Sequence, residues 1–393
     1  MLFNKDRAMD VIDGCKVDAL IASSLENVFY ISDYWSLRLQ LQCGAQAFAL
    51  MPMKGQPAII APMSEADLVM ESGTWIDDVR FYGPPNVKIS KADEASEETQ
   101  RLAKLYREAD SMDDALDALV QCIEERDLGR GVLALDTSRT SPKIFDAIQC
   151  KLPEAKLVDG GDLLREIRLI KTDEEVERIQ RATEITEKSM EDALEIVRSQ
   201  ITEIDLASMF EYSVAYDSGK VTYNLIGFRE RSAFPNPIPS TFEAHRGDVI
   251  RMTLGCTWQH YHSNISRTAV IGNVQASAKK RWEAVVEAQE DALDLVKPGA
   301  RLSEIYAVAD KRLNAAGLKQ SSASFGHGIG LECNERPQVD GKADGELTEG
   351  MVINIDVPFL ELGSSGFQVE DTVLVTKKGY ELLTRTDRSL YIL

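Results

Sequence analysis

The spacing of apolar and polar positions in the first 160 residues changes repeatedly, which predicts strands and helices in alternation. Short apolar runs at 19–24, 47–53, 57–62 and 132–136 are typical of buried strands. Lys54 and Gly55 separate the second run from the third and indicate a hairpin. Apolar residues recur at helical spacing from 94 to 126, and a short helix is expected at 142–152. The alternation predicts a three-layer α/β domain.

The remaining residues, from 163 on, combine longer helices with strand-like runs. Thr172 and Glu175 form a capping box in front of an apolar stripe, so a helix is expected to begin there. Further helices are predicted at 278–296 and 303–316, on either side of a Lys-Pro-Gly breaker. No repeat, linker or low-complexity segment interrupts the pattern.

The most informative stretch of this second part is 247–268, GDVIRMTLGCTWQHYHSNISRT. Its apolar residues read as two short strands around a bend at Gly255. Polar and ionisable side chains that could take part in binding or catalysis lie on both sides of that bend. The stretch is therefore the candidate centre of a functional site.

Charge and cysteine content limit the classes of partner and the cellular compartment that we expect. The formal net charge of −20 over 393 residues argues against nucleic acid and anionic membranes as partners. No apolar stretch approaches the length of a membrane span, and the first residues lack a signal-like apolar run. The six cysteines lie far apart without metal-ligand spacing, so we expect reduced thiols. These features predict a cytoplasmic protein that acts on a small molecule.

Four segments resemble the motifs of the pita-bread hydrolases, a family that includes methionine aminopeptidase, aminopeptidase P, Xaa-Pro dipeptidase and creatinase. They are the stretch 247–268, FGHGIGLECNERP at 325–337, INIDVP at 353–358 and GFQVEDT at 366–372. The resemblance implies an α/β (α+β) protein of two domains. A creatinase-like amino-terminal domain is expected at 1–162 and a pita-bread catalytic domain at 163–393, in a homodimer.

Family peptidases hold two metal ions with the side chains Asp, Asp, His, Glu and Glu. Here the matching positions carry Thr253, Asn264, His327, Asp356 and Glu370, and the intervals of 11 and 63 residues between the first three are typical of the family. Two carboxylates are therefore replaced by neutral groups, which are poor ligands for a divalent first-row metal. From this we expect a degenerate metal site and no cofactor. The alternative is one divalent ion at His327, Asp356 and Glu370.

The same positions suggest acid–base chemistry. His327, in a Gly-flanked turn, would shuttle protons, while Asp356 and Glu370 act as acid and base because neighbouring carboxylates raise one another's pKa. His260 replaces the usual glycine of its motif and is a further catalytic candidate. Thr253 and Asn264 are expected to orient the substrate.

Other residues are candidates for binding a substrate carboxylate, because a guanidinium grips a carboxylate with two hydrogen bonds. They are Arg229, Arg231, Arg336 and Arg38, with His262 at the rim of the site. For Arg229 and Arg231 the ordinary alternative is surface ion pairing with Glu230.

Together these observations favour a creatinase-like, metal-independent hydrolase that cleaves a C–N bond in a small polar substrate carrying a carboxylate. A cyclic amidine such as ectoine is the leading substrate, because ectoine hydrolases are creatinase-like chains of similar size. Three alternatives stay open. They are a metal-dependent Xaa-Pro-type dipeptidase with an altered mononuclear site, a catalytically inactive pita-bread binding protein, and a lyase acting on a small zwitterion.

Overall fold

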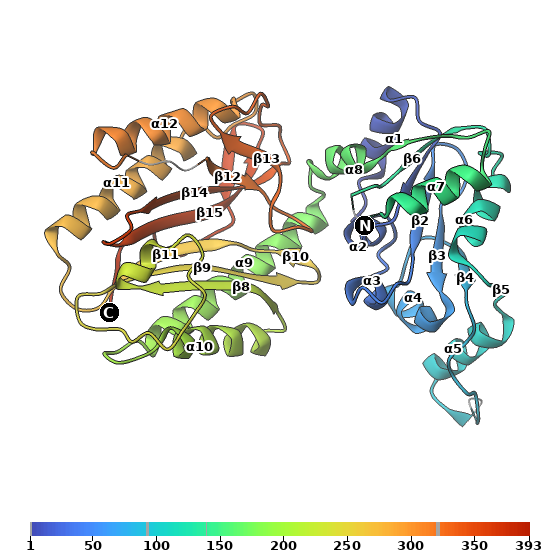
Figure 1. Ribbon diagram of the computed structural model, residues 1–393, viewed down its shortest axis with the longest axis horizontal. Coiled ribbons are helices and arrows are strands. Elements are labelled where there is room, and N and C mark those ends of the chain that lie inside the picture. Colours follow the sequence, from blue (N-terminus) through green and yellow to red (C-terminus); the bar gives the residue numbers. More distant parts are fainter. Residues whose placement is uncertain (1, 92–93, 139, 320–322) are drawn as a thin grey trace. The chain divides into compact units, whose positions relative to one another are not determined.

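The computed structural model describes residues 2–91, 94–138, 140–319 and 323–393. It contains two compact units, the first ending at Arg168 and the second running from Leu169 to Leu393 (Figure 1). The boundary expected after residue 162 falls inside helix α8 (Gly161–Arg168), which contacts α1 (Lys5–Gly14) within the first unit.

The first unit is built around a seven-stranded sheet in the order β5-β4-β3-β2-β1-β6-β7. Every neighbouring pair is parallel except those of β2, which is antiparallel to β1 and β3. The strands are β1 (Ala19–Ala22), β2 (Phe48–Pro52), β3 (Ala58–Pro62), β4 (Asp78–Tyr82), β5 (Ser111–Met112), β6 (Val132–Leu135) and β7 (Lys156–Asp159). The predicted hairpin at Lys54-Gly55 is thus present between β2 and β3.

Helices cover both faces of this sheet (Figure 1). Alternate strand residues such as Ile21, Leu50 and Ile60 pack with α6 (Ala115–Glu124) and α7 (Pro142–Lys151) in one apolar core. The remaining helices of the unit are α2 (Leu25–Ser32), α3 (Leu37–Gln40), α4 (Ala66–Ser72) and α5 (Glu97–Glu108).

The continuous helix predicted over 94–126 is wrong in one respect. Two helices, α5 and α6, occupy the region, and β5 lies between them. Strand β5 pairs with the end of β4, and the Asp114 carboxylate then accepts hydrogen bonds from the N–H groups of Leu116 and Asp117 to start α6. Sheet pairing and a new helix cap therefore override the apolar spacing.

The second unit is a curved, mainly antiparallel sheet between two pairs of helices (Figure 1), in which only the described β17–β11 pair is parallel. Its main path is β10-β9-β11-β15-β14-β12-β13, and β8 pairs with β9, β16 with β15 and β17 with β11. Helices α9 (Asp173–Glu195) and α10 (Glu203–Tyr216) contact β9 and β8, while α11 (Ala276–Leu293) and α12 (Leu302–Ala315) contact β14 and β13. The strands are β8 (Lys220–Phe228), β9 (Val249–Trp258), β10 (Tyr261–His262), β11 (Ile265–Val270), β12 (Ser324–Gly328), β13 (Glu335–Asp340), β14 (Val352–Leu360), β15 (Gly366–Thr376), β16 (Gly379–Leu382) and β17 (Tyr391–Ile392).

Two local predictions in this unit have different outcomes. The capping box of Thr172 and Glu175 is present at the start of α9. The bend expected at Gly255 is absent, because β9 runs through this residue, which pairs with Tyr223 of β8. A β-carbon at Gly255 would lie 2.7 Å from the Ser263 carbonyl oxygen and 3.2 Å from the Tyr223 ring, so the glycine allows close packing of backbone and ring instead of a turn.

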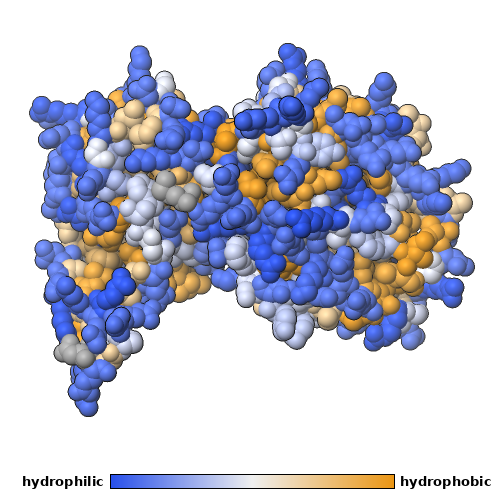
Figure 2. Space-filling view, turned by 180° about the vertical axis from the view of Figure 1, so that it is seen from behind, coloured by the Kyte–Doolittle hydropathy of each residue, from blue (hydrophilic) through white to orange (hydrophobic). Residues whose placement is uncertain are grey.

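Hydrophilic side chains cover much of the face shown in Figure 2, as the charged composition requires. Among the described residues, no helix has the length and apolarity needed to cross a bilayer. All six cysteines are free thiols.

A buried ion network stabilises the second unit. The Arg267 side chain is fully buried, and its Nη2 donates to Asp371 Oδ1 at 2.6 Å. Arg388 Nε donates to the other carboxylate oxygen, Asp371 Oδ2, at 2.7 Å. Arg267 Nη1 also donates to the carbonyl of Glu370 at 2.8 Å, so this network fixes the backbone of β15.

We predict that Asp371→Ala lowers the free energy of unfolding by about 3–5 kcal/mol, because it leaves a buried guanidinium without its partner. Urea unfolding followed by tryptophan emission measures the loss. The matched control is Arg385→Ala, which removes an exposed pair with Glu184 at 3.8 Å and is expected to cost less than about 1 kcal/mol. Equal costs for the two variants would contradict the structural role of Asp371.

Candidate active site

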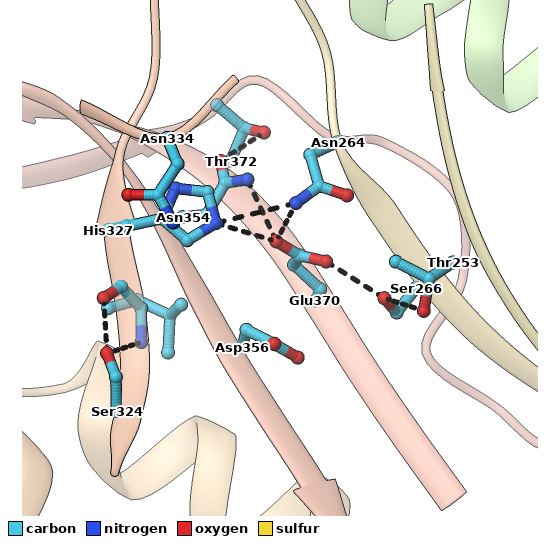
Figure 3. A network of polar contacts seen from close by, with 12 residues as sticks. Thr253, Asn264, Ser266, Ser324, His327, Asn334, Asn354, Asp356, Glu370 and Thr372 are labelled. Carbon is cyan, nitrogen blue, oxygen red and sulfur yellow. Dashed lines mark hydrogen bonds and ion pairs between the residues drawn. The ribbon is translucent and has the colours of Figure 1, made fainter. Parts of the chain in front are cut away.

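Strand register brings the motif positions together. Asp356 of β14 lies opposite Glu370 of β15, and Ser266 of β11 lies between Thr253 and Glu370. His327 of β12 lies opposite Asn354, two residues before Asp356 on β14. Because side chains two residues apart on a strand share a face, these groups point into one space (Figure 3).

Glu370 lies at the centre of this cluster, with a side chain that is 1% exposed. Its Oε1 accepts hydrogen bonds from Asn264 Nδ2 at 2.5 Å and Asn354 Nδ2 at 2.9 Å. Its Oε2 accepts one from Ser266 Oγ at 2.8 Å (Figure 3). Three donors compensate the lost hydration of the buried carboxylate and hold it in one orientation.

His327 faces Glu370 with its Nε2 atom, 3.6 Å from Glu370 Oε1. Its Nδ1 lies 2.9 Å from the carbonyl of Gly328, and since a carbonyl only accepts, Nδ1 carries the proton. Burial alone would lower the pKa of His327, but the hydrogen bond and charge of Glu370 raise it above its usual value. The imidazole therefore presents Nε2 to the site as its exchangeable position.

Glycines surround His327 because the backbone is crowded there. A β-carbon at Gly326 would lie 2.1 Å from the carbonyl oxygen of Asn354, and one at Gly328 would lie 2.1 Å from that of Arg336. The GHG sequence thus allows neighbouring strands to approach closely enough to set the imidazole beside Glu370.

Asp356 has a different environment. Burial, with the nearby charge of Glu370, raises the pKa of Asp356 to about 8. Gln368 Nε2 donates to Asp356 Oδ1 at 2.9 Å. The carboxyl group of Asp356 is therefore mainly neutral near pH 7.

The two neutral replacements take part in the network as well. Thr253 Oγ1 donates to Gln368 Oε1 at 3.1 Å. Asn264 uses its amide N–H for Glu370, while its Oδ1 is buried and has no hydrogen-bond partner among the described residues. An unpaired buried acceptor is costly, so Oδ1 is a position where a ligand group is favoured.

The other histidine candidates lie further along the β9–β11 connection. His262 Nδ1 is 3.2 Å from Thr222 Oγ1, and its place at the rim of the site stays a prediction. His260 lies four residues before Asn264, in the turn that precedes β10, with a left-handed φ of 73°. Burial, Lys220 and Arg178 lower the pKa of His260 to about 4, so its imidazole is neutral at physiological pH. Its catalytic role stays a prediction.

The candidate arginines are spread out. Arg231 Nε donates to both carboxylate oxygens of the buried Glu203, at 2.9 and 3.0 Å. Arg229 lies 3.3 Å from Asp248 Oδ1. In the part of the chain that is described, neither arginine hydrogen-bonds to His327, Asp356 or Glu370. The structure therefore does not pair them as a binding site for a substrate carboxylate, and that role stays a prediction.

The remaining two candidates occupy different places. Arg336 is exposed on β13, next to the GHG turn, and its carbonyl packs on Gly328. Arg38 belongs to α3 of the first unit. Burial raises the pKa of the nearby Tyr82, and the charge of Arg38 acts in the opposite direction. Substrate binding by either residue stays a prediction.

Sequence reasoning missed several residues that build the site. Asn354 and Ser266 hold Glu370, and Gln368 holds Asp356. Tyr223 also lies close, since the charges of Glu370 and Asp356 add to burial in raising its pKa. Asn354 and Gln368 stand two residues before Asp356 and Glu370, so the alternation of a strand was the signal that could have found them.

Comparison with known proteins places this geometry in context. Residues 177–377 match the profile of metallopeptidase family M24, and residues 6–170 match the creatinase/prolidase N-terminal domain. The chain is 35% identical over 245 residues to an Xaa-Pro dipeptidase of Pyrococcus horikoshii, covering 62% of this chain and 69% of the relative. The solved prolidase of that organism has a TM-score of 0.78 at 26% identity, over 98% of this chain and 99% of the other.

A further solved structure is similar in fold. The X-Pro aminopeptidase of Thermotoga maritima, 23% identical, has a TM-score of 0.80 with both chains covered in full. The expected architecture is therefore confirmed: an α/β protein with a creatinase-type amino-terminal domain and a pita-bread second domain.

The same comparisons overturn the expectation that the site needs no cofactor. The matching profile is that of metallopeptidases, and the similar chains are Xaa-Pro dipeptidases, which points to a metal requirement. The sequence argument failed because loss of two carboxylates weakens a site for two ions without removing the ligands for one.

The residues present fit one ion better than two. Two dications would face only the carboxylates of Asp356 and Glu370, whereas one dication is matched in charge by that pair. The unpaired Asn264 Oδ1 adds a neutral oxygen donor. Within the described ranges, no three His, Cys, Asp or Glu side chains stand ready as a metal cluster. Hydrogen bonds from Asn264, Asn354 and Gln368 hold the carboxylates instead.

We predict that Asn264→Asp makes stability depend on metal. Without metal it replaces a 2.5 Å hydrogen bond to Glu370 with carboxylate repulsion, at a cost of about 1–3 kcal/mol. Added Mn²⁺ should raise its thermal midpoint more than that of the unmodified protein. Asn264→Ala controls for the lost amide and should not gain this response. No extra response to Mn²⁺ in the Asp variant would mean that position 264 does not face a cation site.

Proposed function

Because the chain belongs to metallopeptidase family M24, with a creatinase/prolidase N-terminal domain, we propose that it is a metal-dependent hydrolase of Xaa-Pro-type dipeptides. Its degenerate site would use one divalent ion, held by His327, Asp356 and Glu370. The observation that carries the proposal is the buried pair of Asp356 and Glu370 beside His327 Nε2, on the strands that match the family. Two carboxyl groups in one buried site create a demand for a cation.

The ion, when bound, supplies Lewis-acid polarisation of the scissile carbonyl. The chain's own residues do the rest. Asn264, Asn354 and Ser266 orient Glu370, and Gln368 orients Asp356. The bond from His327 Nδ1 to the Gly328 carbonyl fixes the tautomer that presents Nε2.

Proton movement is assigned to Glu370 Oε2. Oε1 accepts from two amides, whereas Oε2 accepts from the Ser266 hydroxyl alone. Oε2 therefore takes the proton of the attacking water, whose oxygen bonds to the scissile carbon. The proton then passes to the leaving nitrogen as the C–N bond breaks.

A cyclic amidine such as ectoine is the second candidate substrate. The observation that favours it is the neutral lining from Thr253 and Asn264, with an unpaired amide oxygen suited to an amidinium N–H. The same panel of assays separates the two candidates.

The homodimer, which the sequence resemblance implies, and the cytoplasmic location, which the cysteine pattern indicates, remain predictions. Light scattering of the purified protein measures the first directly.

We predict that protein loaded with Mn²⁺ or Co²⁺ holds about one ion per chain and cleaves Xaa-Pro dipeptides. His327→Ala should lower kcat/KM by at least about a hundredfold, because it removes one ligand of the ion. Elemental analysis and proline release are the measurements. Circular dichroism of the variant must match the unmodified protein. Two ions per chain would reject the one-ion site, and ion binding without turnover of dipeptides or amidines would favour a binding protein.

A further inference from the structure

Arg251 is a buried cation beside the site that the proposed chemistry does not use. It lies on β9 and is 2% exposed. Its Nε donates to the Ser232 carbonyl at 2.5 Å, its Nη2 donates to the Phe234 carbonyl, and its Nη1 donates to Gln368 Oε1 at 2.5 Å. Within the described residues no carboxylate lies in ion-pair distance of it. A buried charge with only neutral partners is costly, so its presence calls for an explanation.

Gln368 connects Arg251 to the site. Its Oε1 accepts from Arg251 and its Nε2 donates to Asp356 Oδ1 at 2.9 Å, so a single amide separates the guanidinium from the carboxyl group. Burial lowers the pKa of Arg251 only to about 10, so the guanidinium stays charged at neutral pH. Gln368 therefore links a fixed positive charge to the carboxyl group of Asp356 through two hydrogen bonds.

The carbonyl contacts alone do not account for an arginine. The segment that carries Ser232 is already tightly packed, since a β-carbon at Gly366 would lie 2.1 Å from the Ser232 carbonyl oxygen. The Ser232 hydroxyl also accepts a hydrogen bond from the Gly366 N–H at 2.8 Å. A neutral donor would satisfy the same carbonyls without the cost of burying a charge.

We propose that Arg251 is the fixed counter-charge of the site: acting through Gln368, its guanidinium balances Asp356 and Glu370 and takes the place that a second metal ion would have. Arg251 is thus a positioning residue, because it touches neither substrate nor ion. This role rests on the proposed one-ion function. It can nevertheless be tested by ion binding and by unfolding, without measuring turnover.

The first experiment compares Arg251→Gln with Arg251→Lys by Mn²⁺ calorimetry. Gln removes the charge and keeps a donor, whereas Lys keeps the charge. Loss of a positive charge so near the carboxylates should tighten Mn²⁺ binding at least about tenfold in Arg251→Gln. Arg251→Lys should stay within about threefold of the unmodified protein. A purely structural role would instead weaken binding in both variants, and that result would overturn the proposal.

The matched control is Arg281→Lys and Arg281→Gln. Arg281 belongs to the same unit, where it donates to Ser364 Oγ at 2.9 Å and pairs with Glu361 at 2.7 Å. It has no hydrogen bond to Gln368 or Asp356 in the described part of the chain. Neither change should alter Mn²⁺ affinity, so a tenfold shift in the control would also count against the assignment.

The second experiment needs no metal. A double-mutant cycle combines Arg251→Gln with Gln368→Leu and follows urea unfolding of the metal-free protein. If Arg251 acts through Gln368, the two changes together should alter the unfolding constant less than the product of the single effects, with a coupling of about fivefold or more. Additive effects would overturn the proposal. Because this cycle is independent of ion binding, failure of the one-ion function and failure of the counter-charge role give different results.

Discussion

The structure of the site depends on one buried carboxylate. Glu370 is held by Asn264, Asn354 and Ser266, and each of these residues comes from a strand adjoining its own or from the approach to one. A carboxylate without water needs such donors to stay ionised. The donors in turn fix the spacing of β11, β14 and β15, so the anion and the sheet stabilise each other.

Two neighbouring residues of β15 have different roles, one in the candidate site and one in stabilising the fold. Glu370 points into the site, while Asp371, on the opposite face of the strand, binds Arg267 and Arg388. Arg267 also donates to the Glu370 carbonyl, so the structural ion network sets the backbone position of the functional residue. A site built in this way is rigid because its support lies one residue away on the same strand.

Local patterns predicted much of this from the sequence. The capping box at Thr172, the β2–β3 hairpin and the long helices α11 and α12 follow from short-range rules, and the in-register motif positions do come together. The break between α5 and α6 depends on pairing with β4, which no local pattern contains. The link between Arg251 and Gln368 spans β9 and β15, with β11 between them. Contacts between strands so distant in sequence require the sheet order to be known.

The absence of two carboxylates at positions 253 and 264 does not by itself decide whether a metal binds. What decides is the balance of charge in the buried volume: Asp356 and Glu370 are acidic, while Arg251 supplies a cation through Gln368. With Arg251 in place, the demand for positive charge is smaller than in a site of carboxylates alone. On the proposed role of Arg251, the site keeps its strands, its histidine and its central carboxylate because a guanidinium compensates part of the charge that ions would supply.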